Sequence, residues 1–380
     1  LKQFSLSPYF WMNRFAVRKE LRKTFTSTIN EWRLYIETFL KWLVIASLIG
    51  GVGGLIGAIF HHSIDMAEVF RSTHPWLLWL LPIAGLLIVG FYKMTKTEGL
   101  NTNHVIRAVH KGKKLSVMLM PAIFFATVLT QLCGGSAGRE GAALQMGGTI
   151  GQWIGRGLHL DDSDLRIATL AGMAAFFSAL FGTPLAAAVF AVMVISIGIL
   201  YHVALVPCLI ASLSAYFLAG ALGVQPVRFA VQVPEASAMT FFQVGFLGIL
   251  CALVSIFFCM MMHGAEKGMR KILPNAWLRV LAGAGIIIVL TYLCGTNDYN
   301  GVGMGVIAAA IEEGKAEPLA FLLKLVFTSV TLAAGFKGGE IVPSFFVGAA
   351  FGCVIAPIIG LPAGFGAAVG LVSVFCGVTN

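Results

Sequence analysis

The chain alternates between long apolar runs and short polar or glycine-rich breaks. Residues 39–60, 76–92, 241–262 and 278–293 contain almost no charged side chains, and each approaches the roughly 20 apolar residues that a bilayer-spanning helix needs. Periodicity is nearly absent within these runs, which is typical of helices that are apolar on all sides. About ten to twelve such segments, several of them short or broken by glycine, predict an all-α polytopic membrane protein.

Composition and charge agree with a membrane protein. Of the 380 residues, 58% are hydrophobic and only 11% are charged, whereas a typical soluble domain carries roughly 25% charged residues. The net charge of +9 is concentrated at helix ends and loops, and the basic stretch 14–23 precedes the first apolar run. The positive-inside rule therefore predicts a cytoplasmic N-terminus, and we expect the protein in the cell (plasma) membrane. Because the basic residues do not interleave with exposed aromatic residues, we expect no nucleic-acid partner.

The sequence offers little for metal or cofactor chemistry. The seven cysteines mostly lie inside apolar runs without a Cys-x-x-Cys pair, and the eight histidines show no metal-binding spacing. The stretch 301–306 (GVGMGV) hints at a dinucleotide loop, but it lacks the strand–turn–helix setting that such a loop requires. We therefore expect no cofactor and no metal, and we expect that the protein is not an enzyme. A membrane enzyme or a cofactor-binding subunit is the alternative from another class.

Three stretches of the chain recur in the same order about 200 residues later. The matched pairs are 60–68 with 259–266, 98–114 with 300–317, and the glycine-rich break around Glu140 with the one around Glu340. The repeat predicts a cytoplasmic segment 1–38, a first transmembrane repeat 39–222 and a second repeat 223–380, which ends early enough that we expect a C-terminal piece to be missing. In a membrane chain, two such halves usually place their site at the shared interface, near the midplane.

The two glutamates are unusual because they interrupt glycine-rich breaks between apolar runs. Gly138 and Gly141 bracket the pair of Arg139 and Glu140, and Gly338 and Gly339 precede Glu340. An ionisable group at membrane depth is costly and usually faces a polar cavity, although each glutamate could instead cap a helix near the membrane interface. The 200-residue offset predicts that they occupy equivalent places in the two halves.

The apolar stretches after these breaks, 142–154 and 341–359, predict helices that begin inside the membrane. A helix of about 14 residues extends ~21 Å, short of the ~30 Å hydrocarbon core. Its free N–H groups and the positive end of its dipole attract an anion. We therefore expect both helices to point at one anion pathway. The stretch 100–103 could add a third helix start with Asn101 and Asn103 as donors, or it could be a plain polar loop. The pairs Gly50/Gly54 and Gly53/Gly57 predict close helix packing.

The motifs at these breaks resemble those of the CLC family of anion channels and proton-coupled anion transporters. The stretch 138–151 (GREGAALQMGGTIG) is similar to the family's Gly-Arg-Glu-Gly-Pro signature, 338–352 (GGEIVPSFFVGAAFG) to its Gly-x-Phe-x-Pro segment, and 99–103 stands where the family has Gly-Ser-Gly-Ile-Pro. The resemblance implies a CLC-type inverted repeat of tilted and half-membrane helices. It also implies a homodimer with a separate ion pathway in each subunit.

For the site, the resemblance implies that Glu140 is a gating glutamate. Glu340 would be a second ionisable group at the central site. The residues expected around the anion are Leu100, Asn101, Asn103, Arg139, Gly141 and Ile341, with ligation partly by the backbone N–H groups of Glu340 and Ile341. We expect Arg139 to hold the helix start or to set the electrostatic potential at the entrance of the ion pathway. We do not expect it to bind the ion directly.

Departures from the family pattern narrow the choice of the transported anion. Leu100 stands in place of the chloride-binding serine, Val194 in place of the internal proton-transfer glutamate, Glu340 in place of an apolar residue, Ala142 in place of proline, and Val342 where a hydroxyl is expected. The first three departures resemble the bacterial fluoride/proton antiporter branch. Fluoride is small and strongly hydrated, so its site must supply several donors. We therefore expect a secondary transporter in the lipid bilayer that exports fluoride in exchange for protons. A chloride/proton exchanger or a chloride channel of the same family is the alternative.

Overall fold

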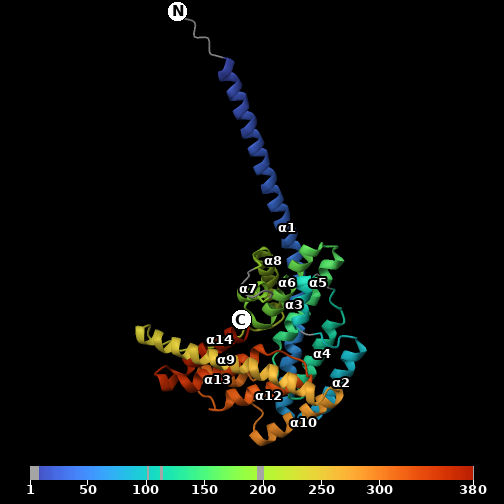
Figure 1. Cartoon of the computed structure of the whole chain (residues 1–380), viewed down its shortest axis with the longest axis vertical. Coiled ribbons are helices and arrows are strands. Elements are labelled where there is room, and N and C mark those ends of the chain that lie inside the picture. Colours follow the sequence, from blue (N-terminus) through green and yellow to red (C-terminus); the bar gives the residue numbers. More distant parts are fainter. Residues whose placement is uncertain (1–7, 101, 112–113, 195–200, 380) are drawn as a thin grey trace, which may run out of the picture.

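The computed structural model describes residues 8–100, 102–111, 114–194 and 201–379. The side chains of residues 8–31, 103, 110 and 111 lie outside this description, as does Asn101 altogether. Within the described part, every regular element is helical, and Figure 1 shows α1 leaving a compact body of packed helices as a long rod. The α-helices are α1 (Pro8–Thr73), α2 (Leu81–Met94), α3 (Thr102–Lys111), α4 (Leu119–Leu132), α5 (Glu140–Gly157), α6 (Asp162–Phe181), α7 (Pro184–Met193), α8 (Leu205–Ala221), α9 (Ala238–Ile272), α10 (Ala276–Cys294), α11 (Met304–Ala308), α12 (Ala320–Ala334), α13 (Ile341–Ile355) and α14 (Ala363–Thr379).

The helices confirm the prediction of an all-α, multi-pass membrane protein. Seven helices of the described chain are long enough and apolar enough to cross a membrane, and four shorter apolar helices accompany them. The shorter helices are α4, α7, α12 and α14. Many large apolar side chains, such as Phe241, Phe242 and Leu293, remain exposed on the outer surface. An apolar surface of this kind fits a bilayer as its solvent.

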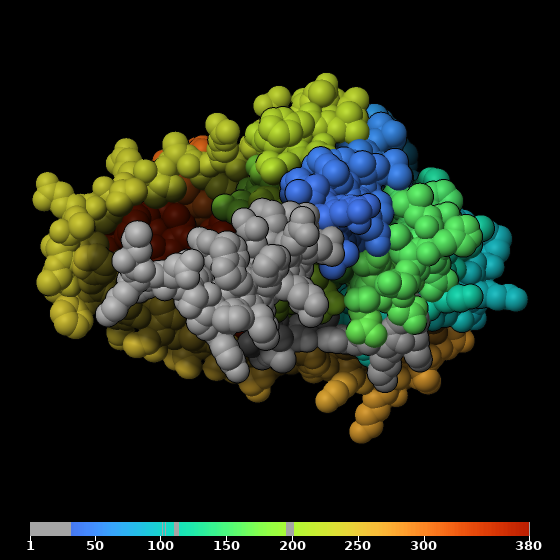
Figure 2. All heavy atoms as spheres, turned by 90° about the horizontal axis from the view of Figure 1, so that it is seen from above, coloured from blue at the N-terminus to red at the C-terminus, as the bar shows by residue number. Residues whose placement is uncertain are grey.

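Helix α1 is continuous through the predicted boundary at residue 38 and then packs into the body. A Cβ at Gly54 would lie 2.9 Å from the Cα of Ala215 in α8, and a Cβ at Gly57 would lie 2.7 Å from the Cβ of Ala179 in α6. The small residues therefore let α1 approach both helices closely, as predicted. Figure 2 shows α1, from residue 32 on, seated between α8 and the turn from α5 to α6, where Lys41 forms an ion pair with Asp164.

The same local plan occurs twice in the chain. Helices α4, α5 and α6 follow one another around a glycine-rich break, and α12, α13 and α14 do so in the second half. In each set the two helices after the break touch through glycine: Gly147 and Gly151 face Gly172, whereas Gly348 and Gly352 face Gly370. In the second half, α9, α12, α13 and α14 lie together (Figure 1).

The structural offset between the halves is 201 residues, not 200. Helix α5 begins at Glu140 and α13 at Ile341, 201 residues later (341 − 140). The residues that precede the two helices, Arg139 and Glu340, are therefore the structural equivalents. The prediction that the two glutamates are equivalent was wrong by one residue. The error is physically important, because successive residues at a helix start point in different directions.

The glycine contacts between α5 and α6 give a test of this packing. A Cβ at Gly151 would collide with the carbonyl oxygen of Ala168, whereas a Cβ at Gly157 meets nothing within 4 Å. We predict that Gly151→Ala destabilises the fold by about 1–3 kcal/mol, the usual cost of overpacking, and that Gly157→Ala leaves stability unchanged. Thermal unfolding of the purified variants in detergent measures this, and equal unfolding temperatures for the two variants would contradict the packing.

Candidate functional site

The two glycine-rich breaks meet as a short antiparallel backbone pair. Gly138 N–H donates to the carbonyl of Gly339 at 2.7 Å, and Gly339 N–H donates to the carbonyl of Gly138 at 2.8 Å. A Cβ at Gly339 would lie 2.6 Å from the amide nitrogen of Gly141. This pair therefore requires glycine, and it places the N-termini of α5 and α13 next to each other inside the protein.

Buried hydroxyl groups hold each break against the helix that precedes the other break, α12 for the first and α4 for the second. Thr331 Oγ1 accepts the Ser136 N–H at 3.1 Å, and Thr130 Oγ1 accepts the Lys337 N–H at 3.3 Å. The two contacts are equivalent under the 201-residue offset. In addition, Gln131 Nε2 donates to the Ala137 carbonyl at 2.5 Å. These contacts satisfy backbone groups that a break in a helix leaves open.

Helices α5 and α13 have no side-chain cap of their own. Elsewhere Asp161, Ser237 and Asn275 accept N–H groups at the starts of α6, α9 and α10. The residues at the corresponding positions of α5 and α13, Arg139 and Glu340, make no such bond. The first N–H groups of both helices are therefore left for another acceptor, and the helix dipoles favour a negative one.

Glu140 supplies that acceptor across the two halves. Its carboxyl group is buried, and Oε1 accepts the N–H of Val342 in the first turn of α13 at 2.9 Å. The backbone N–H groups of Arg139, Glu140 and Ile341 also face the carboxyl group, and a Cβ at Gly138 would collide with it. Oε2 has no hydrogen-bond partner in the described structure. The carboxylate thus lies in a nest of N–H groups that suits any small anion.

Glu340 does not lie in this nest. Its side chain is exposed and lines a cavity of about 620 Å³, together with His263, Glu266 and Lys337. Lys337 Nζ lies 4.4 Å from the centre of the Tyr92 ring, on the wall of the same cavity. His263 and Glu266 lie on α9, so Glu340 faces α9. Arg139, the equivalent residue in the first half, faces α1.

The same cavity brings together several of the predicted site residues. Leu100, Gly141 and Ile341 line it with Glu340, and so does Val194. The carboxyl group of Glu140 and the side chain of Arg139 do not belong to its lining. Asn101 and the Asn103 side chain lie outside the described residues, so their predicted role as donors is untested. Within the described residues, no group of three His, Cys, Asp or Glu side chains could hold a metal ion.

Arg139 is held by α1 rather than turned toward the nest. Its Nη1 lies 2.9 Å from His61 Nδ1 and donates to Asp65 Oδ1 at 3.1 Å. The guanidinium carbon lies 6.0 Å from the centre of the Phe181 ring. Only 5% of the residue is exposed. Arg139 is thereby tied to α1, and its role in holding the helix start stays a prediction.

Sequence reasoning missed three polar residues near these elements. Thr102 Oγ1 donates to the carbonyl of Gly141 at 3.4 Å and accepts Gln145 Nε2 at 3.2 Å, and both side chains line the cavity of Glu340. Thr102 lies between the two predicted asparagine donors, and Gln145 follows Gly141 by one helical turn, so helical spacing could have found them.

Lys324 is the third residue, and its signal was plain. It is a lysine in the middle of the apolar helix α12 and is fully buried. Its ammonium group donates to the carbonyls of Tyr299 at 3.2 Å and Gly301 at 2.8 Å, and it lies 5.1 Å from the centre of the Phe346 ring of α13. An ionisable residue within a membrane helix is functional more often than not.

The threonine that supports the first break gives a second test. Thr331→Val leaves the buried Ser136 N–H without its acceptor, which costs about 1–3 kcal/mol, and we expect a lower unfolding temperature. Thr149→Val is the matched control, because buried Thr149 bonds only the Gln145 carbonyl of its own helix. Thermal unfolding in detergent compares the two, and an equal loss of stability in both variants would contradict the role of Thr331.

Comparisons with known proteins agree on one family. The family model described as voltage gated chloride channel matches residues 84–380. A chloride/fluoride channel protein of Pseudomonas syringae pv. tomato is 35% identical over 350 residues, which are 90% of this chain and 77% of the relative.

Solved structures show the same fold. The crystal structure of a CLC-type fluoride/proton antiporter superposes with a TM-score of 0.85 at 32% identity, covering 90% of this chain and 87% of that one. A slow cyanobacterial Cl⁻/H⁺ antiporter superposes with a TM-score of 0.74 at 19% identity, over 89% of this chain and 84% of that one. The latter similarity concerns the fold alone.

Proposed function

Because the chain belongs to the CLC, or voltage gated chloride channel, family, we propose that it is a secondary active transporter that exports fluoride in exchange for protons. Glu140 is its gate. The observation that carries this proposal is the bond from the Val342 N–H to the carboxylate of Glu140. The carboxylate of one half thereby occupies the helix N-terminus of the other half.

The gate works by competition for the same N–H groups. An ionised Glu140 fills the nest between α5 and α13 and keeps an anion out. A protonated Glu140 has lost the charge that the helix dipoles favour, so it leaves the nest and an anion takes its place. Each exchange of carboxylate for anion then carries one proton on Glu140, which couples the anion and proton movements. A charge at this depth in the membrane costs free energy unless a site stabilises it, so one anion leaves the nest as another takes its place.

The polar groups near the nest support fluoride as the anion. Fluoride gives up a strongly bound hydration shell, which several donors must replace. The Val342 N–H, the Thr102 hydroxyl and the Gln145 amide lie around the two helix starts. Leu100 offers no hydroxyl for a larger anion. Two of the relatives with more than 30% identity are named for fluoride.

A chloride/proton exchanger or a chloride channel is the second candidate. The family description, which is named for chloride, favours it. In that case backbone N–H groups alone would hold the chloride ion, and Glu340 would serve another purpose than fluoride transport.

In this proposal Glu340 is a second ionisable group. It faces His263 and Glu266 in its cavity and exchanges protons there.

The remaining features of the proposal concern the repeats, the assembly and the orientation in the membrane. We propose that residues 39–222 and 223–380 are the two repeats, and that two copies of the chain form a dimer with one pathway each. The basic segment before the first apolar run supports a cytoplasmic N-terminus in the cell membrane.

The gating role predicts the behaviour of Glu140→Gln. In proteoliposomes loaded with fluoride or chloride, we expect the wild type to release fluoride well above chloride and to drive protons against their gradient. Glu140→Gln cannot carry the proton, so proton movement should stop. Ion-selective electrodes, with and without a proton ionophore, measure both ions. Chloride efflux as fast as that of fluoride would contradict the fluoride proposal, and coupled proton movement in Glu140→Gln would contradict the gate.

The selectivity argument predicts the effect of a hydroxyl at position 100. Leu100→Ser places an O–H donor in the cavity, and we expect the ratio of chloride to fluoride efflux to rise by about tenfold, the effect of ~1.4 kcal/mol from one hydrogen bond. Leu100→Ala is the matched control, because it removes the same side chain without adding a donor. An equal ratio in the two variants would show that the missing hydroxyl does not set selectivity.

A further inference from the structure

Lys324 is a buried charge that the proposed function does not use. It is fully buried in α12, and an ammonium group has three N–H donors. These donors serve the carbonyls of Tyr299 at 3.2 Å and Gly301 at 2.8 Å. The ammonium nitrogen also lies 5.1 Å from the centre of the Phe346 ring. Carbonyl oxygens and the face of an aromatic ring both attract a cation, so the surroundings of Lys324 suit a charged ammonium group.

The loop 299–303, between α10 and α11, closes around this ammonium group. Gly303 has a φ of +80°, in the left-handed region that favours glycine. A Cβ at Gly303 would lie 2.8 Å from Cδ2 of Phe346 and 3.3 Å from Nζ of Lys324. Tyr299, at the start of the loop, is 5% exposed. The loop is therefore packed into the protein, and Lys324 holds it there through two carbonyl groups.

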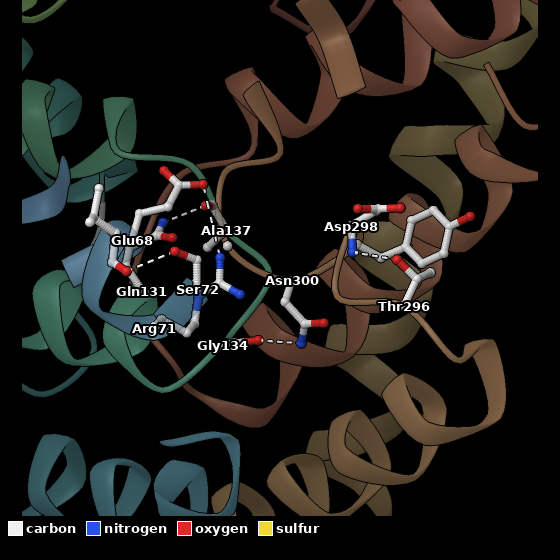
Figure 3. A network of polar contacts seen from close by, with 12 residues as sticks. Glu68, Arg71, Ser72, Gln131, Gly134, Ala137, Thr296, Asp298 and Asn300 are labelled. Carbon is white, nitrogen blue, oxygen red and sulfur yellow. Dashed lines mark hydrogen bonds and ion pairs between the residues drawn. The ribbon is translucent and has the colours of Figure 1, made fainter. Parts of the chain in front are cut away.

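The same loop binds the first glycine-rich break. Asn300 Nδ2 donates to the carbonyl of Gly134 at 2.7 Å, a bond that Figure 3 shows together with the turn after α4. The Gly301 N–H donates to the carbonyl of Gly135 at 3.2 Å. Gly135 lies three residues before Gly138, the first member of the backbone pair. The loop that Lys324 holds thus binds the chain directly before that pair.

One face of α12 is turned toward this break. Lys324, Thr328 and Thr331 are four and three residues apart, which places them on one side of a helix. Thr328 Oγ1 lies 3.0 Å from Ser136 Oγ, and Thr331 Oγ1 accepts the Ser136 N–H at 3.1 Å. The second half of the chain therefore holds the break of the first half, the one that carries Glu140.

The equivalent position in the first half is apolar. Under the 201-residue offset, Ile123 of α4 takes the place of Lys324, and its side chain has no donor. Thr127, which takes the place of Thr328, has a buried hydroxyl group without a partner in the described residues. The repeat itself therefore does not require a cation at this position, whereas the break that carries Glu140 is supported by one.

We propose that Lys324 is a positioning residue of the gate. Its two bonds fix the loop 299–303, and the loop fixes the turn after α4. This turn leads into the start of α5, where the carboxylate of Glu140 accepts the Val342 N–H. The inference rests on the proposed function, because it gives Lys324 a part in coupling the anion to the proton. A carboxylate that is held loosely leaves the nest without first taking a proton, so an anion passes without exchange.

The test measures coupling and local opening separately. Fluoride and proton movements are followed together in proteoliposomes, and hydrogen exchange of the backbone amides around Gly138 is followed by mass spectrometry on the purified full chain. Lys324→Met keeps a side chain of similar length but has no donor. We expect the amides at the break to exchange about tenfold faster in this variant, as the loss of one hydrogen bond to a charged group implies. Fluoride efflux should continue, and the number of protons moved per fluoride ion should fall.

Asn300→Ala removes the next contact in the same series and should produce the same two changes. This variant decides the question alone if Lys324→Met does not fold. Because both residues act through one loop, the double variant should lose no more coupling than the more affected single variant. Losses that add would show two independent effects and overturn the proposal.

Ser237→Ala is the control variant. Ser237 accepts the Thr240 N–H at the start of α9, so its loss destabilises a helix start that is not part of the break. Coupling and exchange at the break should match the wild type. Unchanged coupling or unchanged exchange in Lys324→Met and Asn300→Ala overturns the proposal, and so does an equal loss of coupling in Ser237→Ala.

A failure of the proposed function gives a different result. In that case the wild type moves no protons with fluoride, and hydrogen exchange alone decides the role of Lys324. Faster exchange around Gly138 in Lys324→Met, but not in Ser237→Ala, then supports the positioning of the break, and equal exchange in the two variants overturns it.

Discussion

The structure depends on one short backbone contact, the pair of hydrogen bonds between Gly138 and Gly339. It joins the two glycine-rich breaks and thereby fixes the starts of α5 and α13 beside each other. A helix N-terminus presents open N–H groups and a partial positive charge, and two of them in one place repel each other unless an anion lies between them. The carboxylate of Glu140 lies at this position, and we propose that a transported ion takes its place.

The charges around this contact differ between the two halves although the backbone plan repeats. At the first break, Arg139 faces Asp65 and His61 on α1 in a bonded cluster. At the second break, the equivalent residue is Glu340, which faces His263 on α9 across an open cavity. One side of the backbone contact thus carries a closed ion pair, whereas the other side carries an exposed acid. The two halves therefore place different titratable groups beside the same backbone contact.

The sequence predicted the parts of the site that depend on single residue types. Glycine next to glutamate between apolar runs marked both breaks, and the start of each half-helix was correct to within two residues. The register between the halves was wrong by one residue, because glycine-rich apolar sequence aligns almost as well with either offset. The starts of α5 and α13 and the backbone pair of Gly138 with Gly339 decide between them. Thr102 and Gln145 bond each other across 43 residues of sequence, and only their spacing from Asn101, Asn103 and Gly141 pointed to them. Lys324 could have been found from the apolar run that surrounds it.

The central claim is that the carboxylate of Glu140 and the transported anion compete for the same N–H groups. It is tested most directly by proton uptake when sodium fluoride is added to the purified protein in weak buffer. An anion that displaces the carboxylate makes Glu140 bind a proton, by linkage. The account predicts that the wild type takes up a proton as it binds fluoride, up to about one proton per ion, and that Glu140→Gln binds fluoride without uptake. Fluoride binding to the wild type with no proton uptake, or equal uptake in the variant, would contradict it.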